Sequence, residues 1–208
     1  MIELETDGGF WIATIRRPGK ANSLTATMLA DLGDIARRAK GQARALVLTG
    51  EGRVFSAGAD LDEARAGLAT SPLWEELSGA ITGLPCLTIA ALNGTLAGGA
   101  FGMALACDLR LSVPEARFFY PVMRLGFLPQ PSDPGRLAAL VGPARASLLL
   151  MAGAKVEAPE ALAWGLVDRL VAPDALLDEA RALAADALAA DPDHAAAIKA
   201  LIRAARAA

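Results

Sequence analysis

The chain has 208 residues, of which 54% are hydrophobic and 5% aromatic, and its formal net charge is -3. This length predicts one hydrophobic core, and the excess of Ala, Leu and Val predicts that small aliphatic side chains on helices fill it. The basic residues form no long block, so a nucleic-acid partner is not expected. The sequence also contains neither a secretory signal nor an apolar run long enough to cross a membrane.

The two cysteines, Cys86 and Cys107, lie in apolar segments. A free cysteine in such a segment behaves as a small buried hydrophobic residue, and two cysteines without metal-ligand spacing do not form a zinc site. We therefore expect no metal site and a cytoplasmic protein.

The first half of the chain alternates strand-like and helix-like segments. Residues 2–6 and 10–15 flank a turn signal and predict a β-hairpin. A loop at 16–24 leads into a helix after Thr25, because apolar residues recur at helical spacing as far as Ala39. Short apolar runs at 45–49 and 86–92 predict buried strands, and a helix is expected over 72–82.

The second half predicts one further strand at 109–113 and a strand-like segment from 116, followed by an irregular region with prolines. Helices are expected over 136–141, 143–152, 158–164, 176–190 and 194–207. Strands and helices that alternate in this way indicate an α/β fold.

Two strand-to-helix turns consist of small residues, Ala57-Gly58-Ala59 and Gly98-Gly99-Ala100. The N–H groups at the start of a helix lack partners within the helix and favour an anion or an oxygen that gains negative charge. The glycines could equally serve only the close packing of a helix on a strand. The spacing does not separate these two interpretations.

Several blocks of sequence follow one another in a fixed order, at residues 17–24, 47–61, 89–94, 97–99, 105–110, 116–118, 125–126, 140–146 and 160–168. The most extended is VLTGEGRVFSAGADL at 47–61, and ALNG at 91–94 precedes AGG at 97–99. Together these blocks resemble the crotonase superfamily, the enoyl-CoA hydratase/isomerase family. The resemblance implies a core of ββα turns arranged as a spiral over residues 1–172. Residues 173–208 would form a C-terminal helical extension, within the same domain or as a trimerisation region.

The same resemblance implies an acyl-CoA thioester as substrate, so coenzyme A arrives with the substrate and no tightly bound cofactor is expected. It also implies a homotrimer or a dimer of trimers and a role in fatty acid metabolism. Family members continue into further helices that close the acyl pocket, so a chain ending at Ala208 is expected to have a more open pocket or one that is finished differently.

The resemblance further assigns the backbone N–H groups of Ala59 and Gly99 to an oxyanion hole for the thioester oxygen, which agrees with the donor interpretation of the two turns. Residues near the pantetheine arm and the rest of coenzyme A would then be Lys20, Ala57, Ala59, Asp60, Leu61, Gly98 and Gly99. Lys20 borders the nucleotide end in this scheme, although a surface lysine also serves solubility.

The sequence departs from the family at both catalytic glutamates of its hydratases, because Gly102 and Val122 occupy the aligned positions. Hydration needs a base within reach of the water, so the two-glutamate mechanism is disfavoured and a double-bond shift is favoured slightly. Asp133 is the nearest carboxylate by alignment and is either a general base or a turn and capping residue. Tyr120 is expected to pack with its hydroxyl in water. The alternative function is a catalytically degenerate protein that binds CoA thioesters or assembles with partners.

Overall fold

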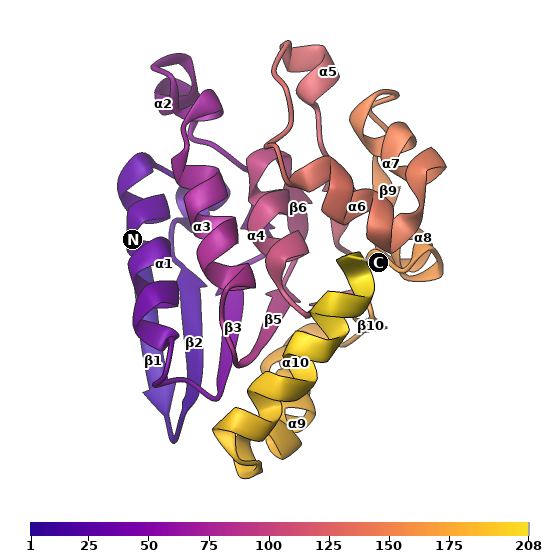
Figure 1. Ribbon diagram of the computed structural model, residues 1–208. Coiled ribbons are helices and arrows are strands. Elements are labelled where there is room, and N and C mark those ends of the chain that lie inside the picture. Colours follow the sequence, from indigo (N-terminus) through magenta and orange to yellow (C-terminus); the bar gives the residue numbers. More distant parts are fainter. Residues whose placement is uncertain (208) are drawn as a thin grey trace.

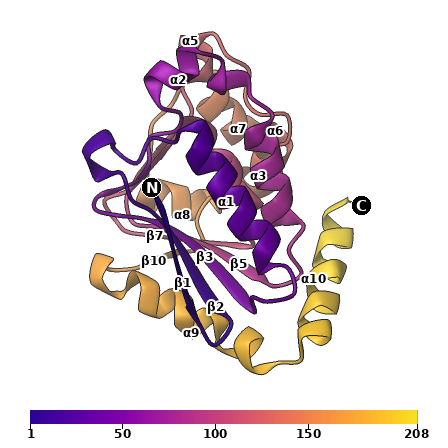
Figure 2. The same cartoon turned by 90° about the vertical axis from the view of Figure 1, so that its left-hand side faces the viewer.

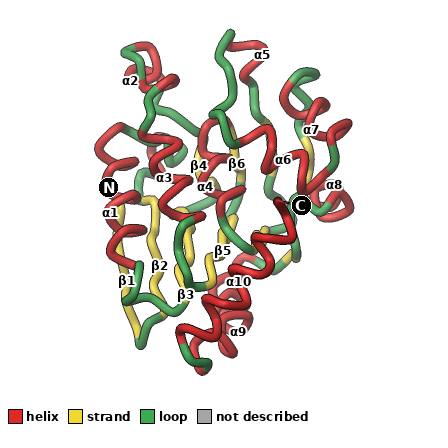
Figure 3. The backbone as a smooth tube through the Cα atoms, viewed as in Figure 1, coloured by secondary structure: helices red, strands yellow, loops and turns green. Residues whose placement is uncertain are grey.

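Two β-sheets organise the chain in a computed structural model that describes residues 1–207 (Figures 1 and 3). The larger sheet has the order β1-β2-β3-β5-β7-β10, and the smaller has the order β4-β6-β8-β9. The strands of the larger sheet are β1 (Ile2–Asp7), β2 (Phe10–Ile15), β3 (Ala45–Gly50), β5 (Leu87–Leu92), β7 (Leu109–Ser112) and β10 (Arg169–Leu170). Those of the smaller sheet are β4 (Val54–Ser56), β6 (Thr95–Ala97), β8 (Arg117–Phe119) and β9 (Val156–Glu157).

The predicted hairpin is confirmed, since β1 and β2 pair antiparallel with Ile2 opposite Ile15. The neighbours β2-β3, β3-β5, β5-β7 and β7-β10 are all parallel. Ala45, Leu46 and Val47 of β3 are fully buried. A parallel sheet is covered on both faces, which explains why this strand is apolar without alternation.

Helices cover the two faces of the larger sheet. On one face α1 (Ala26–Ala39), α3 (Leu73–Thr82), α4 (Phe101–Ala106) and α6 (Asp133–Val141) pack in a row (Figure 1). On the other face α9 (Leu176–Ala189) packs on β3, β5 and β7 (Figure 2). The remaining helices are α2 (Leu61–Arg65), α5 (Val122–Leu125), α7 (Pro143–Leu150), α8 (Ala158–Trp164) and α10 (Pro192–Ala207), with short 3-10 turns η1 (Pro18–Lys20), η2 (Leu68–Thr70), η3 (Gly98–Ala100) and η4 (Pro173–Ala175).

The C-terminal helix α10 returns to the face that carries α3 and α4 (Figure 2). Lys199 Nζ donates to the carbonyl of Cys86 and lies 2.6 Å from Asp108 Oδ2, while Arg203 donates to the carbonyl of Leu84 at 2.8 Å. Two cationic side chains therefore tie α10 to the start of β5. Among residues 1–207 no helix is long and apolar enough to cross a membrane.

The α/β class and most of the predicted elements are confirmed, with two local differences. Helix α6 begins at Asp133 rather than near Arg136, because Pro134 fits the first turn of a helix, where an N–H group needs no partner. The smaller sheet consists of strands of two or three residues, which are too short to show a periodic pattern in the sequence.

Candidate active site

The two small-residue turns lie side by side at the carboxyl ends of two neighbouring strands of the smaller sheet. Strands β4 and β6 are parallel neighbours, with Val54 opposite Thr95, so the turns that follow them emerge together. A Cβ atom on Gly58 would be 2.9 Å from the carbonyl oxygen of Ala97 and 3.4 Å from the nitrogen of Gly99. Gly58 also has a φ of +91°. Only glycine allows both this conformation and this close approach.

The N–H group of Ala59 points away from the neighbouring segment around Leu24, which pairs with the Ala59 turn. Leu24 donates to the carbonyl of Gly58 at 2.8 Å, and Asp60 donates to the carbonyl of Leu24 at 2.8 Å. Because peptide groups alternate along an extended chain, the amide of Ala59 faces the opposite side. Neither this amide nor that of Gly99, in the first turn of η3, donates in any turn or loop hydrogen bond of residues 1–207. The two turns thus offer two free donors to a ligand oxygen.

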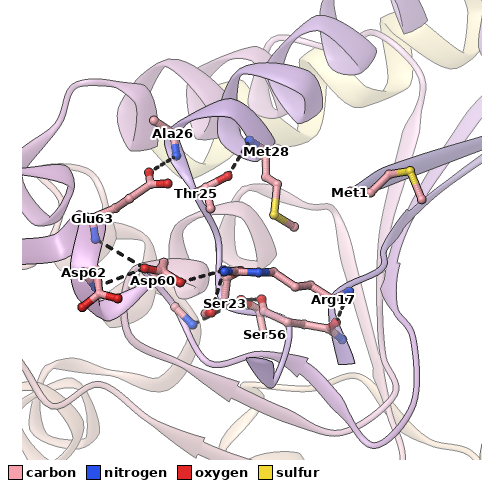
Figure 4. Close-up of polar contacts among 12 residues, drawn as sticks. Met1, Arg17, Ser23, Thr25, Ala26, Met28, Ser56, Asp60, Asp62 and Glu63 are labelled. Carbon is pink, nitrogen blue, oxygen red and sulfur yellow. Dashed lines mark hydrogen bonds and ion pairs between the residues drawn. The ribbon is translucent and has the colours of Figure 1, made fainter. Parts of the chain in front are cut away.

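An ion pair fixes the turn that carries Ala59 (Figure 4). The Arg17 guanidinium donates to Asp60 Oδ2 at 2.8 Å and to the carbonyl of Ser23 at 3.1 Å. Asp60 Oδ1 accepts the N–H groups of Asp62 at 3.1 Å and Glu63 at 3.4 Å and so caps α2. The hydrogen bond from Arg17, followed by that from Glu63, lowers the pKa of Asp60. The Asp60 carboxylate therefore contacts protein groups and positions the turn.

Asn22 joins the loop before α1 to the turn between β3 and β4. It is fully buried and has a φ of 51°, a conformation that Asn tolerates better than most residues. Its side chain accepts the N–H of Arg17 at 2.9 Å and donates to the carbonyls of Glu51 at 2.9 Å and Val54 at 2.6 Å. Its own carbonyl accepts the Ser56 hydroxyl at 2.8 Å. Asn22 thus connects both segments that lead into the Ala59 turn.

Replacement of Asn22 by Ala is expected to lower the free energy of unfolding by roughly 3 kcal/mol. The partly buried Arg17 N–H and Glu51 carbonyl lose the Asn22 side chain, and the Val54 carbonyl is left with the longer bond from Asn93 at 3.3 Å. Urea denaturation measures this loss. Thr27→Ala, at an exposed position of α1, is the control and should change stability by less than about 0.5 kcal/mol. A similar small effect of Asn22→Ala would contradict the role given to the side chain.

Asp133 occupies the space beside Gly102. A Cβ atom on Gly102 would be 3.0 Å from Asp133 Oδ1, and Gly102 lies one turn after Gly99 along η3 and α4. Asp133 is fully buried, and its Oδ1 has no hydrogen-bond partner within residues 1–207. The absence of a side chain at Gly102 therefore leaves room for a carboxylate that comes from α6.

Tyr120 holds the second oxygen of this carboxylate. Its hydroxyl donates to Asp133 Oδ2 at 2.8 Å, and its ring stacks on Phe101 with centroids 5.3 Å apart. Tyr120 is 2% exposed, so the expectation that its hydroxyl lies in water is wrong. The aromatic stack keeps the hydroxyl inside the protein, where Asp133 is its acceptor.

The environment of Asp133 keeps a substantial fraction of its carboxyl group protonated near pH 7. Burial raises the pKa of Asp133 to about 7, against the opposing effects of the Tyr120 hydrogen bond and the Arg136 charge, while Glu75 adds a smaller upward contribution. A carboxylate with this pKa can both accept and return a proton near pH 7. The arrangement is suited to proton transfer at a carbon beside a polarised carbonyl.

The other residues predicted to border a ligand differ in their exposure to solvent. Ala57 and Leu61 are exposed, Leu61 by 70%, and Gly98 is half-buried. Lys20 is exposed on η1. Val122 is buried at the start of α5. In the described part of the chain no group of three His, Cys, Asp or Glu residues could hold a metal ion.

Sequence reasoning missed the contact between Tyr120 and Asp133, and it gave no role to Trp74, which lies against Gly99. The aromatic residues at 116–120 predicted a strand, but nothing near them in the sequence indicated which group would accept the Tyr120 hydroxyl. Trp74 appeared only as an apolar residue of a helix. Neither contact has a local signal, because each joins elements far apart in the chain.

Known proteins resemble this chain over most of its length. The model of the family described as "Enoyl-CoA hydratase/isomerase" matches residues 5–207. A Citrobacter koseri protein named "Carnitinyl-CoA dehydratase" is 37% identical over 200 residues, which are 92% of this chain and 76% of that protein. A Rhodobacter capsulatus protein named "Probable enoyl-CoA hydratase" is 37% identical over 171 residues, 80% of this chain and 66% of that protein. The chain thus spans just under two thirds of this last relative.

Solved structures show the same likeness over almost the whole chain. An enoyl-CoA hydratase subunit from Geobacillus kaustophilus superimposes with a TM-score of 0.90 at 32% identity, covering 100% of this chain and 82% of that one. The structure of DspI from Pseudomonas aeruginosa gives a TM-score of 0.90 at 32% identity, covering 99% of this chain and 87% of that one.

Proposed function

Because the chain belongs to the enoyl-CoA hydratase/isomerase family, as its sequence blocks predicted, we propose that it acts on an acyl-CoA thioester by stabilising an enolate. The N–H groups of Ala59 and Gly99 bind the thioester oxygen, and Asp133 is the base. The observation that carries the proposal is the buried, unpartnered Oδ1 of Asp133 beside Gly102, one turn from Gly99. A double-bond shift fits this set of residues better than hydration does.

The reaction needs only one proton-carrying group. The Asp133 carboxylate takes a proton from the α-carbon of a β,γ-unsaturated thioester, and the electron pair of that C–H bond forms the enolate. The two backbone donors stabilise the negative oxygen; removal of one such donor typically costs about 3 kcal/mol. The protonated Asp133 then returns its proton to the γ-carbon, which leaves the double bond conjugated with the carbonyl.

Hydration makes a larger demand on the site. A water molecule must be activated by a base while a proton is delivered to the α-carbon. The family positions for two glutamates hold Gly102 and Val122, and Val122 is apolar and buried. Asp133 provides a single carboxylate on the Gly102 side, which supports proton shuttling in preference to water addition.

The direct test is exchange of α-protons into deuterated water, followed by mass spectrometry over a panel of saturated and β,γ-unsaturated acyl-CoAs. Exchange together with conversion to the conjugated thioester would support the proposal. Calorimetry with coenzyme A and acyl-CoAs runs in parallel. Binding without exchange would instead support the catalytically degenerate thioester-binding protein, and the absence of both would reject the two functions.

The exchange rate is expected to rise with pH and to level off above about pH 7. Only the ionised form of Asp133 can accept the α-proton, and burial raises the pKa of this group to about 7. Below that pH the logarithm of kcat/KM should increase with a slope near one. A profile that is flat between about pH 5 and pH 8 would show that another group is the base.

A further inference from the structure

The indole ring of Trp74, on α3, covers the glycine that carries one of the two free amides. A Cβ atom on Gly99 would be 3.3 Å from ring atoms Cδ2, Cε2 and Cε3 of Trp74. Trp74 is 4% exposed, and its Nε1–H donates to the carbonyl of Leu68 at 2.8 Å. This hydrogen bond therefore holds the ring by its edge, and the ring packs directly against Gly99.

Trp74 and Asp133 cover successive positions on one face of the same helical segment. Gly99 and Gly102 are three residues apart, so both face the same side. Trp74 packs where a side chain of Gly99 would extend, and Asp133 where a side chain of Gly102 would extend. An acyl group with its carbonyl at the amide of Gly99 and its α-carbon at Asp133 would therefore lie next to the indole.

A set of hydrogen bonds fixes Trp74 relative to Asp133. Glu75, the neighbour of Trp74, accepts the Ser132 N–H at 2.9 Å and the Ser132 hydroxyl at 2.6 Å. Gln130 donates to the carbonyl of Ala69 at 3.3 Å. The segment that carries the indole is thus tied to the loop that precedes the carboxylate, and a displacement of the Trp74 backbone away from Asp133 would break these contacts.

We propose that Trp74 closes the acyl end of the site and restricts the substrate to short acyl groups. This inference rests on the proposed function, because it concerns the same oxyanion hole and the same base. A rigid aromatic wall discriminates between chains by steric exclusion, and even one methylene can change kcat/KM by about tenfold or more. Trp74 is accordingly a specificity-determining residue.

The test compares butyryl-CoA with decanoyl-CoA, by calorimetric Kd and by α-proton exchange, in the wild type and in Trp74→Leu. The wild type should favour butyryl-CoA by about 100-fold in kcat/KM. Trp74→Leu should reduce that ratio by about tenfold or more, mainly through a gain with decanoyl-CoA. Trp74→Phe, which keeps an aromatic ring, should give a smaller change and serves if the Leu variant does not fold.

Trp11→Leu is the matched control, because Trp11 is a 6% exposed tryptophan on β2, outside the site. This variant loses a buried indole but should keep the wild-type preference. Equal use of both thioesters by the wild type, or an unchanged ratio in both Trp74 variants, would overturn the role of Trp74 and leave the proposed function intact. Failure of the wild type to bind or exchange either thioester would reject both.

Discussion

Replacement of Asp133 by Asn is expected to reduce α-proton exchange by roughly 10²- to 10⁴-fold, the usual contribution of a positioned acid–base group. The amide has nearly the size of the carboxyl group, and its oxygen can still accept the Tyr120 hydroxyl, but it cannot take up a proton. The two backbone donors remain in place. The Kd for an acyl-CoA, measured by calorimetry, should therefore change by less than about threefold.

Asp31→Asn, at an exposed position of α1, is the control for the loss of one negative charge and should leave exchange unchanged. If Asp133→Asn exchanged α-protons at the wild-type rate, another group would have to be the base. A parallel loss of binding and exchange would point instead to a structural role for the carboxyl group.

The same variant reports how protonation of Asp133 affects stability. Its pKa rises from 3.8 in the unfolded chain to about 7 in the folded protein, so the folded protein binds more protons between these values. The contribution of Asp133 to stability is therefore fully present below about pH 4 and is lost as pH rises to about 7. Over that range the unfolding free energy of the wild type should decline, relative to Asp133→Asn, by up to about 1.4 kcal/mol per pH unit.

The pair of turns could be predicted from the sequence because its signals are local. Gly58 and Gly99 each follow a strand-like run and precede a helix, and parallel neighbouring strands end at the same edge of a sheet. The hairpin and α1 were predictable for similar reasons of periodicity and turn chemistry. The sequence pattern did not predict the contact between the two turns. The close approach of Gly58 to Ala97 depends on the register of β4 against β6.

The carboxylate of the site illustrates the opposite case. The family resemblance implied that Gly102 occupies a glutamate position and that Asp133 is the nearest carboxylate, but the sequence did not separate a base from a helix cap. The structure places Asp133 Oδ1 against Gly102 because α6 packs on α4, and it reveals Tyr120 as the partner of Oδ2. Such contacts arise only when distant elements pack, and no single-sequence pattern encodes them.

Replacement of Gly58 by Ala is expected to lower kcat for exchange by roughly 10²- to 10³-fold, as the loss of one oxyanion-hole donor does in other enzymes. The added methyl group would lie 2.9 Å from the carbonyl oxygen of Ala97, and the φ of +91° is unfavourable for Ala. Because backbone atoms form the obstacle, the Ala59 turn must move relative to the Gly99 turn. The two N–H groups then no longer converge on one oxygen.

Gly52→Ala separates this effect from backbone strain. Gly52 has a similar φ of +80°, but the nearest atom to its added Cβ is Cβ of Pro18 at 3.8 Å, an ordinary contact. Both variants should lose stability from the unfavourable φ, measured by thermal unfolding, and Gly58→Ala should lose more because of its contact with the Ala97 carbonyl. Only Gly58→Ala should lose catalysis. Exchange rates within about threefold of each other in the two variants would mean that the adjoining turns do not form the oxyanion hole.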